Sequence, residues 1–159
     1  WIPVLIGDVA IYEAAAITIY LCDQYPLAGL APRPDQMTRG LFLQTLVYFS
    51  SSIQNAFQLN YYPDRFAETS DGYSGVMQRG IRRLRETWQV IDTQIGENQW
   101  VLGDKFSAVD IYLFMLTTWL KDSRGHPSVQ DFPSAARIAK KVLLRPATLK
   151  VYSEALQIK

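Results

Sequence analysis

The fold is decided near the start of the sequence, where residues 1–25 read WIPVLIGDVAIYEAAAITIYLCDQY. Apolar residues alternate with other residues on both sides of a Gly7-Asp8 pair, which is typical of two antiparallel strands joined by a two-residue turn. Strong helix formers follow these strands up to Pro26, where a helix must end. The pattern predicts a β-β-α unit with its strands before residue 13 and its helix over residues 13–25.

A two-stranded hairpin is marginally stable in water and leaves both of its edges unpaired. The predicted unit therefore needs further strands, and the sequence shows no other strand pattern. The chain also opens at Trp1 rather than at a methionine, without the basic and apolar regions of a secretory signal. We expect a further amino-terminal segment that completes the sheet.

The rest of the chain has a different character. Residues 27–34 (LAGLAPRP) combine proline and glycine, a composition that suits a semi-rigid linker. Over residues 35–159 only helical patterns follow, separated by turn signals, and they predict an all-α domain of about five helices. The expected fold class is α+β, with the strands confined to residues 1–26.

One predicted helix carries no charged residue, since residues 41–62 read LFLQTLVYFSSSIQNAFQLNYY. The stretch is long enough to span a bilayer, but its many serine, asparagine and glutamine side chains would lose hydrogen bonds in hydrocarbon. We interpret it as a soluble helix that is covered on several sides by its own domain, by a partner subunit or by a ligand cleft.

The helix predicted over residues 73–95 has one apolar stripe and ends at Gly96. Four basic residues lie mostly on its other side: Arg79, Arg82, Arg83 and Arg85. Because the net charge of the chain is close to zero, these arginines indicate a solvated helix face rather than an anion-binding row.

Residues 107–120 (SAVDIYLFMLTTWL) are apolar almost all the way round, as expected for a central core helix. The Ser107 side chain can accept a hydrogen bond from the amide of Asp110, while the Asp110 carboxylate accepts one from the amide of Ser107. We interpret this pair as a structural cap rather than a catalytic site, and expect the cap to contribute roughly 1 to 2 kcal/mol.

The charge and the cysteine content argue against several classes of function. With 16 basic and 15 acidic residues, the net charge is +1 and the pI about 8.0, so nothing favours binding to nucleic acid or to a membrane surface. The single cysteine, Cys22, can form neither an internal disulfide nor a cysteine metal cluster. We expect a cytoplasmic protein without a metal.

Three parts of the sequence resemble cytosolic glutathione S-transferases of the bacterial type. They are WIPVL at residues 1–5, EAAAI at residues 13–17 with Tyr20 and Leu21, and GDKFSAVD at residues 103–110. The resemblance covers the whole chain. It implies that residues 1–26 are the second half of a thioredoxin-like, glutathione-binding domain, that residues 27–34 are the linker, and that residues 35–159 are the all-α carboxy-terminal domain.

In this family, the strand that starts with the proline and the start of the next helix bind glutathione. The resemblance implies a cis bond between Ile2 and Pro3, which turns polar backbone groups of Ile2 toward the cysteinyl part of the ligand. It also implies that Glu13 meets the γ-glutamyl ammonium group. Position 14 is alanine where the family has serine, so the amide of Ala14 remains for the γ-glutamyl carboxylate but the hydroxyl is missing.

The family activates the glutathione thiol with a tyrosine, serine or cysteine that would precede Trp1, so no catalytic residue is assigned within the chain. Cys22 is interpreted as a small buried thiol inside its helix. His126 follows a glycine and precedes a proline, and is interpreted as an ordinary loop residue.

The family binds its second substrate between its two domains, which implies a pocket formed by Tyr48, Ser52, Asn55 and Trp119. Aromatic rings with a few neutral polar groups suit a small, planar, hydrophobic electrophile. The same side chains can equally be core or dimer contacts, because the family forms two-fold homodimers through this long helix.

The resemblance therefore implies a glutathione S-transferase with glutathione as its co-substrate, which conjugates the thiolate to an electrophile or reduces the electrophile with it. The alternative is a noncatalytic glutathione-transferase-like module for binding or assembly, because a fold alone does not establish an activity. The missing hydroxyl at Ala14 favours the module, whereas the uncharged, aromatic-rich helix favours the enzyme.

Overall fold

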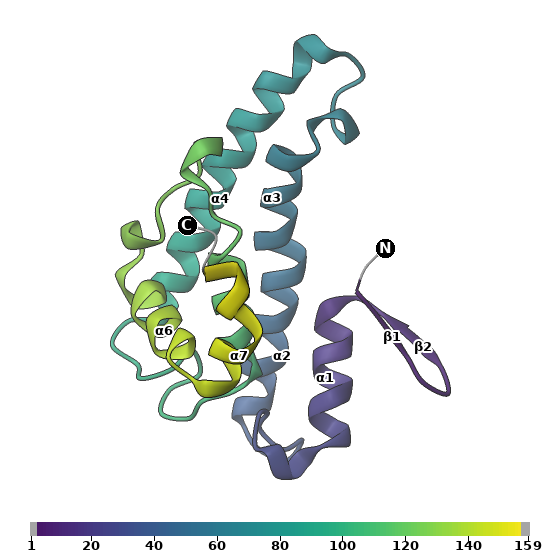
Figure 1. Ribbon diagram of the computed structural model, residues 1–159, viewed down its shortest axis with the longest axis vertical. Helices are drawn as coiled ribbons and strands as arrows, with labels where there is room; N and C mark the ends of the chain where they lie inside the picture. Colours follow the sequence, from purple (N-terminus) through teal and green to yellow (C-terminus); the bar gives the residue numbers. More distant parts are fainter. Residues whose placement is uncertain (1–2, 157–159) are drawn as a thin grey trace.

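A β-hairpin opens the computed structural model, which describes residues 3–156 (Figure 1). Strand β1 (Val4–Ile6) pairs antiparallel with strand β2 (Ala10–Tyr12). The pairing leaves residues 7–9 as the connection, so the prediction of a two-residue turn is wrong. The reason is that Val9 is apolar and continues the alternation, although it belongs to the loop.

Helix α1 (Ala14–Gln24) follows the hairpin and lies between it and the long helix that comes next in the chain (Figure 1). The residue before α1, Glu13, has a φ of 69°, a left-handed conformation that residues with a side chain rarely adopt. Cys22 is half-buried in α1, and burial raises the pKa of its thiol. This thiol is packed rather than activated.

Three consecutive segments form one continuous helix: α2 (Thr38–Tyr48), a π-helical segment (Phe49–Ile53) and α3 (Gln54–Tyr61) (Figure 1). This helix contains the charge-free stretch predicted as helical. Among residues 3–156, none of the helices has the length and apolar character needed to cross a membrane. Short π-helical insertions often occur at functional sites, because they change the direction of the side chains that follow.

Helix α4 (Tyr73–Ile95) runs beside α3 and has the bounds that the sequence predicts (Figure 1). Its four arginines are exposed, which confirms the solvated face. At Gly80 the two helices come so close that a Cβ atom would lie 3.0 Å from the backbone nitrogen of Asn60. The packing of α3 on α4 therefore depends on a residue without a side chain.

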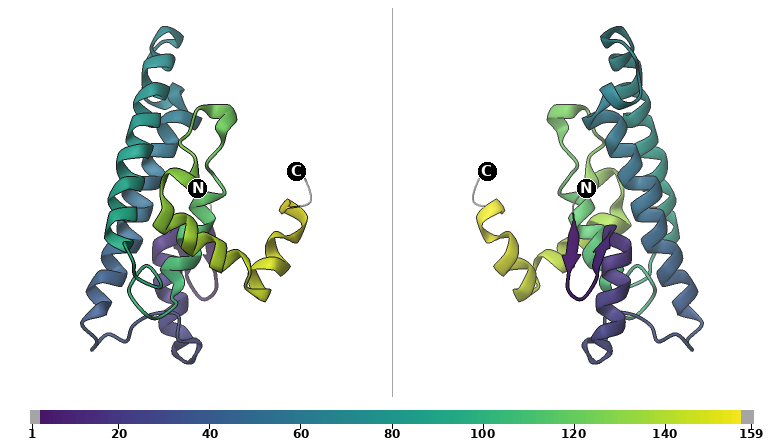
Figure 2. Two further views of the ribbon diagram at one scale, coloured as in Figure 1. Left: turned by 90° about the vertical axis from the view of Figure 1, so that its left-hand side faces the viewer. Right: turned by 90° about the vertical axis from the view of Figure 1, so that its right-hand side faces the viewer.

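The remaining helices are α5 (Ala108–Thr117), α6 (Pro133–Leu143) and α7 (Pro146–Leu156). Helix α5 is the central one, and its Val109 and Leu113 have no exposed surface. Figure 2 shows α7 standing apart from the α3 and α4 pair. With the long helix counted once, five α-helical stretches lie within residues 38–156, in agreement with the sequence.

The capping box predicted at Ser107 and Asp110 begins α5. Oδ2 of Asp110 accepts hydrogen bonds from the backbone N–H and the hydroxyl of Ser107, at 2.8 and 3.0 Å. Oδ1 accepts a third bond, from the backbone N–H of Val101 at 2.8 Å. Asp110 is fully buried, and this burial raises the pKa of its carboxyl. The residue therefore ties α5 to the preceding loop as well as capping the helix.

Residues 27–34 are attached to the helical part of the molecule. The backbone N–H of Ala108 donates to the carbonyl of Leu30 at 2.7 Å, which joins this segment to the start of α5. Arg39 in α2 pairs with Asp23 in α1 at 2.9 Å. These contacts hold α1 against the long helix and thereby position the cavity described next.

Candidate functional site

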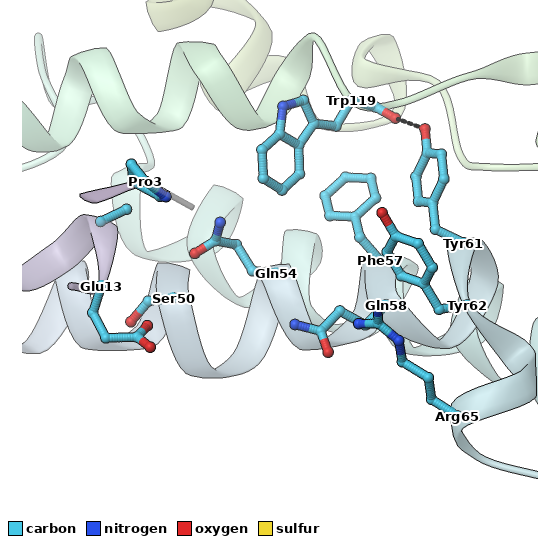
Figure 3. A pocket seen from close by; sticks show the side chains of 11 residues that line it. Pro3, Glu13, Ser50, Gln54, Phe57, Gln58, Tyr61, Tyr62, Arg65 and Trp119 are labelled. Carbon is cyan, nitrogen blue, oxygen red and sulfur yellow. Dashed lines mark hydrogen bonds between the residues drawn. The ribbon is translucent and has the colours of Figure 1, made fainter. Parts of the chain in front are cut away.

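A cavity of about 560 Å³ lies where the hairpin, the start of α1, the long helix and the chain after α5 meet (Figure 3). This volume suits a small-molecule ligand. The lining residues come from segments far apart in the sequence: Pro3, Glu13, Ala14, Ser50, Gln54, Phe57, Gln58, Tyr61, Tyr62, Arg65 and Trp119. The cavity has an acidic end beside Glu13 and an aromatic end beside Trp119 (Figure 3).

The acidic end is formed by the backbone at the start of α1. The first hydrogen bond of the helix runs from the Ile17 N–H to the Glu13 carbonyl at 2.9 Å. Residues 14–16 therefore have backbone N–H groups without a partner inside the helix, next to the positive end of the helix dipole. An anion can bind to these amides while the Glu13 carboxylate binds a cation one residue earlier.

The aromatic end is a connected wall of rings. Trp119 meets Phe57 edge-to-face, with the ring centroids 5.6 Å apart, and Phe57 lies 6.3 Å from Tyr61. The Tyr61 hydroxyl donates to the backbone carbonyl of Trp119 at 3.1 Å. This bond joins α3 to the chain after α5, so the wall is held from both sides.

Two arginines stack on the tyrosines of this wall. The guanidinium of Arg65 lies 4.2 Å from the centre of the Tyr62 ring, and that of Arg124 lies 4.1 Å from the centre of the Tyr61 ring. Such cation–π contacts attract each guanidinium to the face of its tyrosine ring. Arg65 lines the cavity, so the aromatic end also carries a positive charge.

Gln54 lies between the two ends of the cavity (Figure 3). The Tyr112 hydroxyl donates to its Oε1 atom at 2.7 Å. Burial, together with the charge of Glu13, raises the pKa of Tyr112 to about 12, so its hydroxyl stays protonated and acts as a donor near neutral pH. This hydrogen bond determines which way the Gln54 amide faces.

His126 lies in a loop, as predicted, and it is buried behind the aromatic wall. Its Nδ1 accepts a hydrogen bond from the Lys121 N–H at 3.1 Å, and its Nε2 lies 2.9 Å from Oδ1 of Asn60. With Nδ1 as an acceptor, the imidazole is neutral and donates from Nε2. Burial, assisted by the nearby charge of Arg124, lowers the pKa of this histidine.

The free energy of unfolding is expected to fall as the pH is lowered from about 7.5 to about 5.5, and His126 should cause part of this fall. The unfolded chain takes up a proton near the ordinary imidazole pKa of 6.5, whereas the folded protein resists protonation until the pH is lower. The unfolded state therefore binds more protons in this range. Urea unfolding at several pH values measures how steeply the free energy of unfolding changes with pH. This slope should be smaller in His126→Gln. Equal slopes in the two proteins would contradict this role.

The structure brings four residues from the predicted sites to this one cavity: Pro3, Glu13, Ala14 and Trp119. Ile2 and the bond that joins it to Pro3 lie outside the described residues. The contact of these residues with glutathione stays a prediction.

Tyr48, Ser52 and Asn55, which were predicted to form the second-substrate pocket, are not among the residues that line this cavity. The Tyr48 hydroxyl donates to the backbone carbonyl of Thr87 at 3.1 Å, which turns this helix face toward α4. The face that lines the cavity begins two positions later, at Ser50. Each residue turns an α-helix by about 100°, so a shift of two positions leads to the opposite side.

Sequence reasoning did not assign Gln54, Phe57 and Tyr61 to the site. They follow Ser50 at helical spacing, and this spacing is the signal that could have found them. The spacing of the residues chosen instead, starting at Tyr48, is equally regular. The two faces are both uncharged and rich in polar and aromatic side chains, so the sequence pattern did not distinguish them.

Comparison with known proteins agrees with the fold. Residues 74–140 match the family described as glutathione S-transferase, C-terminal domain. The chain is 26% identical to glutathione S-transferase F14 of Arabidopsis thaliana over 162 residues, which cover 94% of this chain and 61% of the relative. The structure matches that of a sphingomonad glutathione S-transferase complexed with glutathione, with a TM-score of 0.77 and 26% identity, over 93% of this chain and 70% of the other. Over most of its length the chain is similar to glutathione S-transferases.

Another structure with this fold is a glutathione transferase homologue from Sulfitobacter with bound glutathione. It gives a TM-score of 0.85 at 21% identity, over 97% of this chain and 82% of the other. The chain spans about three fifths of the length of the glutathione S-transferases from Arabidopsis and Escherichia coli O157:H7 that it matches, at 61% and 56%.

Proposed function

We propose that this chain forms part of the glutathione site and the second-substrate pocket of a glutathione S-transferase. The enzyme would conjugate glutathione thiolate to a small hydrophobic electrophile, or reduce the electrophile with it. The observation that carries the proposal is a single cavity that joins the start of α1 to an aromatic wall. The sphingomonad relative is described as complexed with glutathione, which supports the choice of ligand.

The acidic end suits the γ-glutamyl part of glutathione, which carries one ammonium group and one carboxylate. The Glu13 side chain would bind the ammonium, and the backbone N–H of Ala14 would donate to the carboxylate at the positive end of the α1 dipole. The left-handed backbone of Glu13 supports this assignment, because strained residues cluster at ligand sites.

The aromatic end suits a planar, hydrophobic electrophile. Phe57, Tyr61 and Trp119 offer ring faces and edges, and the bond between the Tyr61 hydroxyl and the Trp119 carbonyl holds them in place. A compound bound here would lie next to a glutathione molecule bound at Glu13. Such proximity lowers the entropic cost of the reaction between the two molecules.

A noncatalytic binding module is favoured by one observation, the alanine at position 14, which removes a hydroxyl donor from the glutathione site. The cavity argues for the enzyme instead. Its aromatic end supplies room for a second molecule, and a module that only assembles with other proteins has no need for this room.

Glutathione binding, measured by calorimetry on the complete natural protein, tests the proposal. Glu13→Ala should weaken binding about tenfold, because a charge-assisted bond at an open cleft is lost. Ala14→Ser should tighten binding by about the same factor, because the new hydroxyl can donate to the γ-glutamyl carboxylate.

Two controls make this test specific. Glu68→Ala removes an exposed acid outside the cavity and should leave the binding constant unchanged. A glutathione analogue without the amino group should bind the Glu13→Ala variant and the parent protein equally well. If neither Glu13→Ala nor Ala14→Ser changes the binding of glutathione, then glutathione does not bind at this end of the cavity, and the binding module becomes the better explanation.

We also propose that the protein forms a two-fold homodimer in the cytoplasm. Leu41, Leu43 and Val47 expose between 36% and 55% of their surface along α2, and a second copy of the chain can cover them. The absence of any cysteine other than Cys22 fits a reducing compartment. Analytical ultracentrifugation of a Val47→Glu variant should then show a shift toward the monomer.

A further inference from the structure

His126 connects the two segments that form the aromatic wall, α3 and the chain after α5. Its ring lies edge-to-face against Phe57 and Tyr61, with the ring centroids 5.5 and 5.6 Å away. Both of these rings line the cavity (Figure 3). His126 is only 5% exposed and is not a lining residue, so it supports the wall from behind.

The hydrogen bonds of His126 fit one protonation state. The Lys121 N–H donates to Nδ1, so Nδ1 carries no proton, and Nε2 donates to Oδ1 of Asn60. The first bond closes the loop that follows Trp119, and the second attaches this loop to α3. The neutral imidazole therefore holds the loop, and with it Trp119, against α3.

A proton on Nδ1 would break this arrangement. Nδ1 and the Lys121 N–H would then both be donors, and two donors cannot share a hydrogen bond. A hydrogen bond with the Trp119 backbone favours the protonated ring, and the Trp119 carbonyl already accepts from the Tyr61 hydroxyl at 3.1 Å. The protonated ring therefore loses its bond to Lys121 and competes for the carbonyl that joins Trp119 to α3.

The surroundings of His126 oppose its protonation. Burial lowers the pKa of His126, and the nearby charge of Arg124 lowers it as well. From α3 the titratable neighbour is Tyr61. From α4 the uncharged Ile81 approaches the loop, since a Cβ atom at Gly125 would lie 3.2 Å from its Cδ1. Among residues 3–156, no carboxylate pairs with the imidazole.

We propose that His126 is a positioning residue of the aromatic wall, and that an apolar aromatic ligand binds this end of the cavity tightly only while His126 is neutral. The inference rests on the proposed function for the place of the ligand. When His126 is protonated, the loop that carries Trp119 separates from α3 and the ligand is released. Because such coupling is reciprocal, a bound ligand must in turn make His126 harder to protonate.

The test uses the complete natural protein and N-phenyl-1-naphthylamine, an uncharged aromatic probe that fluoresces in apolar surroundings. Fluorescence titration gives its dissociation constant at each pH. We expect this constant to be about fivefold larger at about pH 5 than at about pH 7.5, because histidine titrates within this range. The side chain in His126→Gln stays neutral, so the constant of this variant should be the same at both pH values.

Asn60→Asp should shift the pH at which the probe is released. The new carboxylate lies beside Nε2 of His126 and favours the protonated ring, so release should occur about one pH unit higher. Among residues 3–156, nothing accepts a hydrogen bond from Nδ2 of Asn60, so the exchange removes no donor that is in use. Asn55→Asp is the matched control, because it adds the same charge at an exposed position of α3 and should leave the release unchanged. A purely structural role of His126 predicts no shift in either variant.

Nuclear magnetic resonance measures the protonation of His126 directly, and its imidazole signal is identified by its loss in His126→Gln. Saturation with the probe should lower the pKa of His126, by the same free energy that protonation takes from the binding of the probe. The measurement is made on the parent protein, so it does not depend on the stability of Asn60→Asp. Melting temperatures at both pH values confirm that each variant is folded.

The outcomes separate the inference from the proposed function. If His126→Gln loses affinity at low pH as the parent protein does, or if the probe leaves the titration of His126 unchanged, the inference is overturned. Equal binding by Trp119→Ala and the parent protein overturns it as well, because the probe then lies outside the aromatic wall. Failure to bind glutathione overturns the proposed function alone, since none of these titrations contains glutathione.

Discussion

Replacing Asp110 by alanine is expected to lower the free energy of unfolding by about 3 kcal/mol, which is more than a helix cap ordinarily contributes. The carboxylate accepts from the backbone N–H and the hydroxyl of Ser107 and from the backbone N–H of Val101. Asp110 is fully buried, so the alanine variant leaves two backbone donors without partners. The loss stays below the sum of these bonds because desolvation of the charged carboxyl, which raises its pKa, offsets part of it.

Chemical unfolding measures this difference, and Asp104→Ala is the control. Asp104 is an exposed acid in the same loop, and its replacement should change the stability by less than about 0.5 kcal/mol. The folded fraction of Asp110→Ala should bind glutathione as the parent protein does. Loss of activity at unchanged stability would show that Asp110 takes part in the chemistry.

Replacing Gly80 by leucine is expected to lower the free energy of unfolding by about 3 kcal/mol, at the upper end for an overpacked site. A Cβ at this position would lie 3.0 Å from the backbone nitrogen of Asn60 and 3.3 Å from the backbone carbonyl oxygen of Ala56. Backbone atoms of a helix cannot move aside singly, so α3 as a whole must shift away from α4. Because α3 carries Phe57 and Tyr61, we also expect weaker binding of the electrophile.

Gly75→Ala is the matched control in the same helix. A Cβ atom at Gly75 would meet no atom of another segment within 4 Å, so alanine gains helix propensity without a clash and should stabilise the protein by up to about 1 kcal/mol. Thermal unfolding of both variants gives the comparison. A Gly80→Leu protein as stable as the parent would show that α3 and α4 can separate without cost.

The helices could be predicted from the sequence where local chemistry specifies them. Gly96 ends α4 at the expected place, and the capping box of Ser107 and Asp110 begins α5. The bond of Asp110 to Val101 was not predicted, because it joins residues nine positions apart and depends on how the preceding loop folds back. No helix-capping rule contains that contact.

The candidate site could be predicted only in part. The resemblance to the family indicated Glu13 and Ala14 at one end of the cavity, and Trp119 at the other. It did not indicate Gln54. The long helix has two similar uncharged faces, and no periodic signal in the sequence shows which of these faces meets the hairpin. His126 was also missed, since nothing next to it in the sequence shows that Asn60 will cover it.

The sequence by itself determined the order of hairpin, linker and helices, the ends of the helices and the near absence of charge on the long helix. These features depend on backbone propensity, on capping and on the period of the apolar residues, all of which act over a few positions. Tertiary structure alone decided which face of the long helix lines the cavity, that Tyr112 orients Gln54, and that Gly80 allows α3 to approach α4. These outcomes depend on contacts between residues that are tens of positions apart, and such contacts exist only after the helices have packed.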